Sequence, residues 1–260
     1  MFENLEYALP LFISWLALVV VYCACFALGL AIRSRLALEP DSPNEKAFNI
    51  AQGGVSVLAA LILGFSFSFA STRFETRRML VVEEANAIGT TYLRAAYLPR
   101  ASAVRFRSML RDYTQTRLDG YADLPNLVGS EAVERKSVAM QGALWRIAVT
   151  AARDDPRNVQ LGLLTQTLND TMDIAARQSA ALRSHVPVAM LRLELVVSFV
   201  LAMFWGTLFS PTRRVQIFLA IVLAVLFATV ITTVIDLDLP QSGLVRINLT
   251  PLQMQLQSMR

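Results

Sequence analysis

Four long runs without a charged residue constrain this chain more than any other feature. They cover positions 11–32, 48–71, 195–210 and 215–235, and the third extends back to Val188 if Arg192 and Glu194 are tolerated. A membrane helix needs about 20 predominantly apolar residues. Hydrophobic residues make up 55% of the chain, above the roughly 45–50% of soluble proteins. The sequence therefore predicts an integral membrane protein with four transmembrane helices.

The first run is expected to stay in the mature protein. The ten residues before it contain Glu3 and Glu6 but no Lys or Arg, and Arg33 and Arg35 follow it. A signal peptide has a basic start and a shorter apolar core. The run therefore predicts a retained span that the two arginines stop.

The second run passes without a helix breaker into a basic segment that ends before Pro99. We expect one helix from the membrane to about residue 98, roughly 75 Å long at about 1.5 Å per residue. Val57, Leu61 and Phe65 recur at i, i+4 and i+8 on one face of its membrane half. The segment is a candidate pore-lining helix, although these three side chains also suit packing against neighbouring helices.

The stretch 72–187 is polar on average but patterned like helices. Prolines interrupt it at roughly even intervals, and Gly, Asp and Asn residues mark a loop at 120–129. No alternation typical of strands and no internal repeat is present. We expect an all-α extramembrane layer with helices at 72–98, 101–119, 130–154 and 158–184. The predicted parts of the chain are two membrane helices in 1–71, the layer in 72–187, two membrane helices in 188–235 and a tail in 236–260.

The last helix of this layer carries an apolar series close to a heptad seam. Two interpretations stay open: core contact within the layer, or a coiled contact with another subunit or partner. The series consists of Leu161, Leu164, Leu168, Met172 and Ala175.

The layer is basic, with 16 Lys and Arg against 12 Asp and Glu between positions 72 and 187. A cationic vestibule concentrates anions at a pore mouth through its summed field. Arg73, Arg77 and Arg78 follow the second span directly and are the best candidates for such a vestibule charge. The alternative is a solvated surface that attracts anionic lipid headgroups. The excess is small and has no accompanying recognition motif, so nucleic-acid binding is not expected.

Catalysis, metal binding and cofactors are not expected. The single histidine, His185, has no cysteine or carboxylate cluster at ligand spacing beside it, and we expect it at the membrane interface. Cys23 and Cys25 are expected to be packing residues. Adjacent Glu83 and Glu84 diverge by about 100° on a helix, so one is expected to face solvent and the other to form an ion pair.

No span has an ionisable residue at its centre, which favours a passive pore over a proton-coupled carrier. Asn49 and Gln52, followed by two glycines, open the second helix and form either an outer pore mouth or a helix terminus. Ser68 and Phe69 are the candidates for the other mouth of the same pore.

Three motifs carry a family resemblance. LGFSFSFASTRF at 63–74 resembles the bestrophin segment in which the second membrane helix leaves the pore neck. VVEEANAIGTTYLRA at 81–95 and DLDLPQSGLVRI at 236–247 resemble a bacterial family of bestrophin-like membrane proteins, most of them of unknown function. Bestrophins are pentameric anion channels. The resemblance implies a pentamer whose hydrophobic neck is Val57, Leu61 and Phe65.

The sequence departs from animal bestrophins after the fourth span. It lacks the acidic run of their calcium clasp, with only Asp236 and Asp238 in that region. The Pro-Phe-Gly pattern is also missing. Calcium gating is therefore not expected.

Four spans place both termini and the helical layer on one side of the membrane, which the resemblance makes the cytoplasmic side. The excess of basic residues in cytoplasmic loops gives nearly equal support to both orientations. Five basic residues lie on the short-loop side, at positions 33, 35, 46, 213 and 214. Six basic residues lie near span ends on the other side, at positions 73, 77, 78, 177, 183 and 246.

The sequence thus predicts an oligomeric, chloride-preferring channel in a bacterial inner membrane, and not an enzyme. Its partners would be small inorganic anions, the lipid bilayer and copies of itself. A cation-selective channel of the same architecture is the first alternative. A non-conducting scaffold that binds a partner through the seam from Leu161 to Ala175 is the second.

Overall fold

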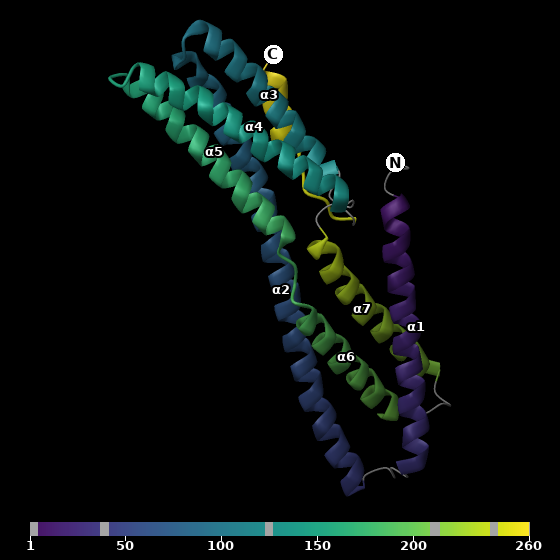
Figure 1. Cartoon of the computed structure of the whole chain (residues 1–260). Helices are drawn as coiled ribbons and strands as arrows, with labels where there is room; N and C mark the ends of the chain where they lie inside the picture. Colours follow the sequence, from purple (N-terminus) through teal and green to yellow (C-terminus); the bar gives the residue numbers. More distant parts are fainter. Residues whose placement is uncertain (1–4, 37–41, 123–126, 209–213, 240–243, 260) are drawn as a thin grey trace. The chain divides into compact units, whose positions relative to one another are not determined.

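The computed structural model describes residues 5–36, 42–122, 127–208, 214–239 and 244–259. Within these ranges the chain is helical and has no strand (Figure 1). The elements in chain order are α1 (Leu5–Leu36), α2 (Pro43–Arg94), the 3-10 turn η1 (Ala95–Tyr97), α3 (Arg100–Ala122), α4 (Leu127–Asp154), α5 (Val159–Arg183), α6 (Val188–Leu208), α7 (Arg214–Asp238) and α8 (Thr250–Ser258).

Four helical stretches are long and apolar enough to cross a membrane. They lie within Leu9–Arg33, Pro43–Tyr97, Val159–Leu208 and Arg214–Asp238. The predicted class, an all-α membrane protein with four spans and a helical layer between the second and third, is confirmed. The protein is therefore a multi-pass membrane protein.

Helix α2 is uninterrupted over 52 residues. Ser42 caps its start, since its hydroxyl accepts a hydrogen bond from the backbone N–H of Glu45 at 3.2 Å. Its end is followed by η1, after which Leu98 is extended, as expected for a residue before a proline. The prediction of one helix running from the membrane segment toward Pro99 is confirmed.

The helices of the layer begin and end close to the predicted positions. Asn158 caps α5, because its side chain accepts from the backbone N–H of Gln160. The loop predicted at 120–129 is partly wrong: α3 continues to Ala122 and α4 begins at Leu127, so helix covers Gly120 and Gly129. Positions 123–126 lie outside the described residues.

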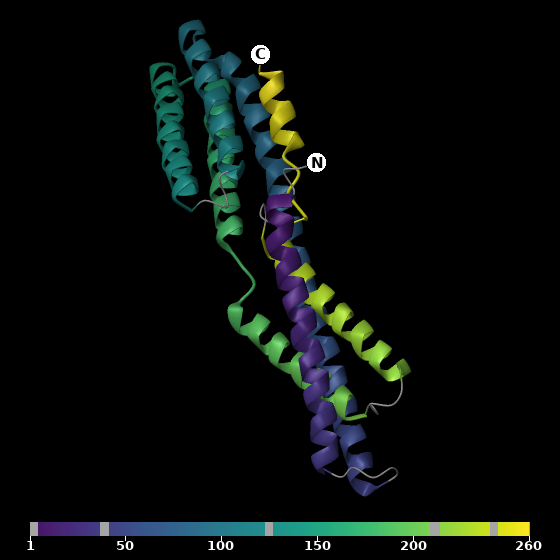
Figure 2. The same cartoon turned by 90° about the vertical axis from the view of Figure 1, so that its right-hand side faces the viewer.

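The chain forms two compact units, Met1–Arg73 with His185–Leu239 and Phe74–Ser184 with Pro240–Arg260. We call them the membrane unit and the helical unit. In the membrane unit α1 packs against both α6 and α7 (Figures 1 and 2). The buried core of this unit consists of Tyr22, Phe26, Ala202, Ala224, Ala228 and Ile231.

Two glycines allow α1 and α6 to approach closely. A Cβ atom on Gly29 would overlap the backbone carbonyl of Met203, and one on Gly206 would overlap that of Phe26. Membrane helices use small residues in this way, because close backbone packing replaces the hydrophobic driving force that lipid does not supply. Arg33 adds a polar contact, donating from Nη1 to the Thr207 carbonyl at 2.7 Å in the last turn of α6.

The core of the helical unit is apolar and draws on α2, α3, α4, α5 and α8. The seam of α5 belongs to it: Leu161, Leu164 and Leu168 are at most 3% exposed, and Met172 packs against the same cluster. The interpretation as core contact within the layer is confirmed. The seam is therefore covered by the chain itself and offers no free surface to a partner.

One face of α2 is buried at steps of seven residues, with a single step of four from Ser66 to Ala70. Seven residues are close to two helical turns, so these positions share a side of the helix. Polar side chains occupy most of this buried stripe. In the membrane unit it comprises Gln52, Ala59, Ser66 and Ala70, and in the helical unit Arg77, Glu84 and Thr91.

Candidate functional site

The face of α2 opposite the buried stripe is exposed in the part of the chain that the structure describes. Val57, Leu61 and Phe65 are 72%, 53% and 53% exposed. At about 100° per residue, Ser66 of the stripe lies about 180° around the helix from Val57. The space beside this face is open, because a Cβ atom added to Gly53 or Gly64 would meet no atom within 4 Å. The three predicted neck residues thus share a surface that the chain leaves open.

The predicted pore-mouth residues divide between the two sides of α2. Asn49, Ser68 and Phe69 are exposed, as a mouth requires. Gln52 belongs to the buried stripe and is only 6% exposed. The interpretation of Gln52 as a mouth residue is wrong for the single chain, because it lies three residues after Asn49 but faces the core of the membrane unit.

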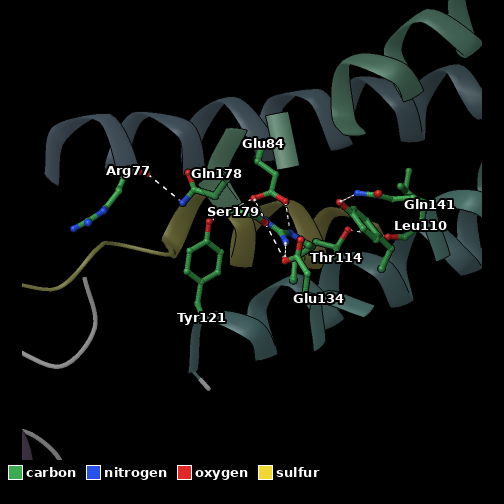
Figure 3. Close-up of polar contacts among 11 residues, drawn as sticks. Arg77, Glu84, Leu110, Thr114, Tyr121, Glu134, Gln141, Gln178 and Ser179 are labelled. Atoms are coloured by element: carbon green, nitrogen blue, oxygen red, sulfur yellow. Dashed lines mark hydrogen bonds and ion pairs between the residues drawn. The ribbon is translucent and has the colours of Figure 1, made fainter. Parts of the chain in front are cut away.

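The three predicted vestibule arginines have different surroundings. Arg77 is fully buried; its guanidinium donates to the carbonyls of Ala181, at 3.0 Å, and Ser184, at 2.6 Å. Both carbonyls lie at the end of α5, where backbone donors become scarce, and that of Ala181 also accepts from the Ser184 backbone N–H at 3.3 Å. Figure 3 shows Arg77 beside Gln178. The side-chain amide of Gln178 donates to the backbone carbonyl of Arg77. Arg77 is therefore a helix cap, and its assignment as a solvent-facing charge is wrong.

Arg78 is exposed but forms a bidentate pair with Glu75, with N–O distances of 2.9 and 2.6 Å. Hydrogen bonding to Arg78 lowers the pKa of the Glu75 carboxyl, so this carboxyl stays ionised beside the guanidinium. The pair has no net charge, which reduces the field that Arg78 contributes. Arg73 is partly exposed.

A buried ion pair lies at the centre of the helical unit (Figure 3). Arg117 on α3 donates to both oxygens of Glu84 on α2, at 2.6 and 3.4 Å, and the two side chains are 8% and 0% exposed. The Tyr121 hydroxyl donates to Glu84 at 3.5 Å. Glu134 on α4 lies 4.0 Å from Arg117 and accepts from Ser179 on α5 at 3.0 Å. The network therefore ties four helices together.

Two tyrosines beside this pair are kept neutral by their environment. Burial, with the nearby Glu84 charge second, raises the pKa of Tyr113 to about 12. The same two causes raise the pKa of Tyr121. Gln141 donates to the Tyr113 hydroxyl at 3.1 Å. These groups are occupied with one another, so the network holds the helices of the unit together.

Neither member of the Glu83–Glu84 pair is left without a cation. Glu84 is the expected ion-pair partner, while exposed Glu83 lies 3.4 Å from Arg177. The partner of Glu84 was not predicted, since Arg117 is 33 residues away. A usable signal was the seven-residue spacing from Ala70 through Arg77 to Glu84, which places both charges on one buried face.

His185 joins the start of α6 to the end of α7. Its Nδ1 lies 3.2 Å from Asp238 Oδ2, and the Val186 backbone N–H donates to Asp238 Oδ1 at 3.0 Å.

In the part of the chain that the structure describes, no group of three His, Cys, Asp or Glu side chains is arranged to hold a metal ion. Cys23 and Cys25 are free thiols, each partly buried.

A family model for the Bestrophin-like domain matches residues 16–252. The chain belongs to the Bestrophin-like family. The match extends from α1 into α8 and so includes both units.

Solved structures of a bacterial bestrophin homolog from Klebsiella pneumoniae share the fold. A tyrosine-to-alanine variant of that homolog has 16% identity and a TM-score of 0.67, covering 93% of this chain and 94% of that chain. A tryptophan-to-alanine variant has 15% identity and a TM-score of 0.69, covering 96% and 95%. The structure phased with zinc has 16% identity and a TM-score of 0.66, covering 95% of each chain. No curated protein matches the sequence.

Proposed function

We propose that this chain assembles into an oligomeric ion channel of a bacterial inner membrane, with α2 lining the pore. The observation that carries the proposal is the free face of α2, on which Val57, Leu61 and Phe65 are exposed opposite the buried stripe. Membership of the Bestrophin-like family and likeness to bacterial bestrophin homologs support it. The family resemblance favours a pentamer, with the helical unit in the cytoplasm.

In such an assembly the three apolar side chains form stacked rings around the axis. An apolar constriction closes by dewetting, so small shifts of α2 change conduction strongly. Phe65 and Phe69 add ring edges that carry partial positive charge, which an anion meets more favourably than a cation does. We therefore propose a hydrophobic neck and a preference for chloride or other small anions.

A cation-selective channel of the same architecture is the second candidate. It is favoured by the surroundings of two of the three arginines, because Arg77 is buried as a helix cap and Arg78 is paired with Glu75. Both features reduce the positive field expected at the vestibule. The seam proposed for a scaffold is buried in the chain's own core, which removes the surface that a scaffold would use.

The test is current across a planar bilayer that contains the purified protein in asymmetric KCl. A reversal potential near chloride equilibrium supports the anion channel, and one near potassium equilibrium selects the second candidate. Phe65→Ala is expected to raise the conductance, since it widens the neck. The matched control is Phe67→Ala, 45% exposed on the same helix but about 160° around it from Phe65. No current from folded, oligomeric protein would refute the proposal.

A further inference from the structure

A carboxyl group is buried in the membrane unit without a cationic partner among the described residues. Glu194, in the second turn of α6, is 1% exposed. Among the described residues, neither of its carboxylate oxygens has a hydrogen-bond partner. An ionised carboxylate in such a site loses its hydration and has no cation to compensate its charge, which is strongly unfavourable. Because Glu194 is already enclosed within a single chain, a neighbouring subunit does not reach it.

Polar side chains from three helices surround this carboxyl. Ser66, on the buried stripe of α2, is fully buried and interacts with Glu194, and its hydroxyl also lacks a hydrogen-bond partner among the described residues. Ser198 lies one helical turn after Glu194 and pairs with Tyr22 of α1 at 2.8 Å. Tyr22 in turn interacts electrostatically with Glu194. The cluster interrupts an otherwise apolar core.

Within the described ranges, no cationic side chain neutralises Glu194 from the elements packed around it. On α1 Tyr22 interacts with Glu194 and Cys25 interacts with Tyr22, and α2 has no charged residue between Lys46 and Arg73. Arg192 on α6 is exposed and lies about 160° around the helix from Glu194.

At the end of α7, the carboxylate of Asp238 is paired with His185, and Asp236 is a second acid. A carboxylate does not neutralise another negative charge, so neither aspartate compensates Glu194. Among the described residues, Glu194 thus interacts with the hydroxyl side chains of Ser66 and Tyr22 and with no cation.

We propose that Glu194 is a proton-binding site of the membrane unit. A proton from water converts the carboxylate to a neutral carboxylic acid, whose O–H donates to the Ser66 hydroxyl. Loss of the proton leaves an uncompensated charge between α2 and α6, and the two helices must separate or admit water. Ser66 directly follows Phe65 on α2, so this movement reaches the proposed neck; the coupling to conduction rests on the proposed function, whereas the proton site does not.

Infrared spectroscopy of the purified protein as a function of pH tests the site directly. The difference spectrum between wild type and Glu194→Gln is expected to contain the carbonyl band of a protonated carboxylic acid at neutral pH. The band should disappear at alkaline pH as the carboxylate band rises. The bands of all other carboxyl groups cancel in this difference spectrum. The control is Glu83→Gln, which removes an exposed, Arg177-paired carboxylate and should remove no such band at neutral pH.

Absence of the protonated band from the wild type minus Glu194→Gln spectrum would overturn the proposal. Repeating the titration in sodium chloride and in choline chloride separates a proton from a metal ion. If sodium removes the band at a pH where choline does not, the site binds sodium and the proton assignment is wrong. Glu194→Gln replaces a neutral acid by a neutral amide of the same shape, so the variant should fold.

Conduction is the second readout. Wild-type current is expected to change between neutral and alkaline pH, and the current of Glu194→Gln should not. If the infrared band is present but neither protein conducts, the channel proposal fails while the proton site stands. If both conduct with the same pH dependence, coupling of Glu194 to the neck is refuted.

Discussion

Replacing Arg117 by methionine is expected to destabilise the helical unit by about 3–5 kcal/mol. Methionine keeps much of the apolar stem but removes both hydrogen bonds to Glu84, which is fully buried. Breaking a buried pair from one side costs about that amount, because the remaining charge is left without compensation. The Tyr121 hydroxyl, at 3.5 Å, is a weak substitute.

Thermal unfolding in detergent measures this loss. Trp145 is the sole tryptophan of the helical unit and packs against its core, so its fluorescence reports on this unit in a Trp15→Phe, Trp205→Phe background. The midpoint should fall by about 10–15 °C. The control is Arg135→Met, which breaks a surface pair with Glu131 at 3.7 Å whose side chains are over 70% exposed. Its effect should stay below about 1 kcal/mol.

A double mutant separates the pair from its packing. Adding Glu84→Gln to Arg117→Met removes the stranded charge, so the double mutant should be more stable than Arg117→Met alone. If the losses of unfolding free energy in Arg117→Met and Glu84→Gln simply add in the double mutant, the uncompensated Glu84 charge is not the main cause of the destabilisation.

Three further perturbations test other parts of the account. Gly206→Ala should lower the free energy of unfolding by about 1–3 kcal/mol, because the added methyl group overpacks against the Phe26 carbonyl. Gly53→Ala, whose added methyl group would meet no atom within 4 Å, should not lower the unfolding midpoint. Equal midpoints for the two variants would contradict the close packing of α1 and α6. Arg77→Met should speed hydrogen exchange in the last turn of α5, because the Ala181 and Ser184 carbonyls lose the guanidinium and Ala181 keeps only its 3.3 Å bond from the Ser184 backbone N–H; unchanged exchange would argue against the cap. Folded protein keeps the Tyr113 proton up to a pKa of about 12, whereas the unfolded chain releases it near pH 10. Stability should therefore fall between pH 10 and 12, by about 1 kcal/mol at pH 11, and less in Tyr113→Phe; an identical decline would refute this assignment.

Local patterns along the chain were sufficient to predict the spans and the layer helices, but not α8, which lies in the stretch expected to be a tail. Uncharged runs indicated the four spans, and a proline beside each boundary indicated the layer helices, because proline removes a backbone donor and restricts the preceding residue. The apolar periodicity of α5 indicated its buried face. These signals act between neighbours in the chain, and that is why they can be read from one sequence.

Pairings between distant segments were not accessible in the same way. Arg73, Arg77 and Arg78 look alike in sequence, yet only Arg77 is aligned with the buried stripe and meets the end of α5. Gln52 was misplaced for the same reason, since its polarity suggested an opening while its position on the stripe buries it. Glu194 was interpreted as a residue at the edge of the third span, because only the packing of three helices encloses it.

Accessibility of the free face of α2 in the conducting protein tests the central claim most directly. In a Cys23→Ala, Cys25→Ala background, Leu61→Cys and Phe65→Cys are compared with Phe67→Cys while a charged thiol reagent is applied during current recording. The reagent is expected to change the current through Leu61→Cys and Phe65→Cys and to leave the current through Phe67→Cys unaffected. Modification of Phe67→Cys with no effect on the other two would show that a different face of α2 lines the pore.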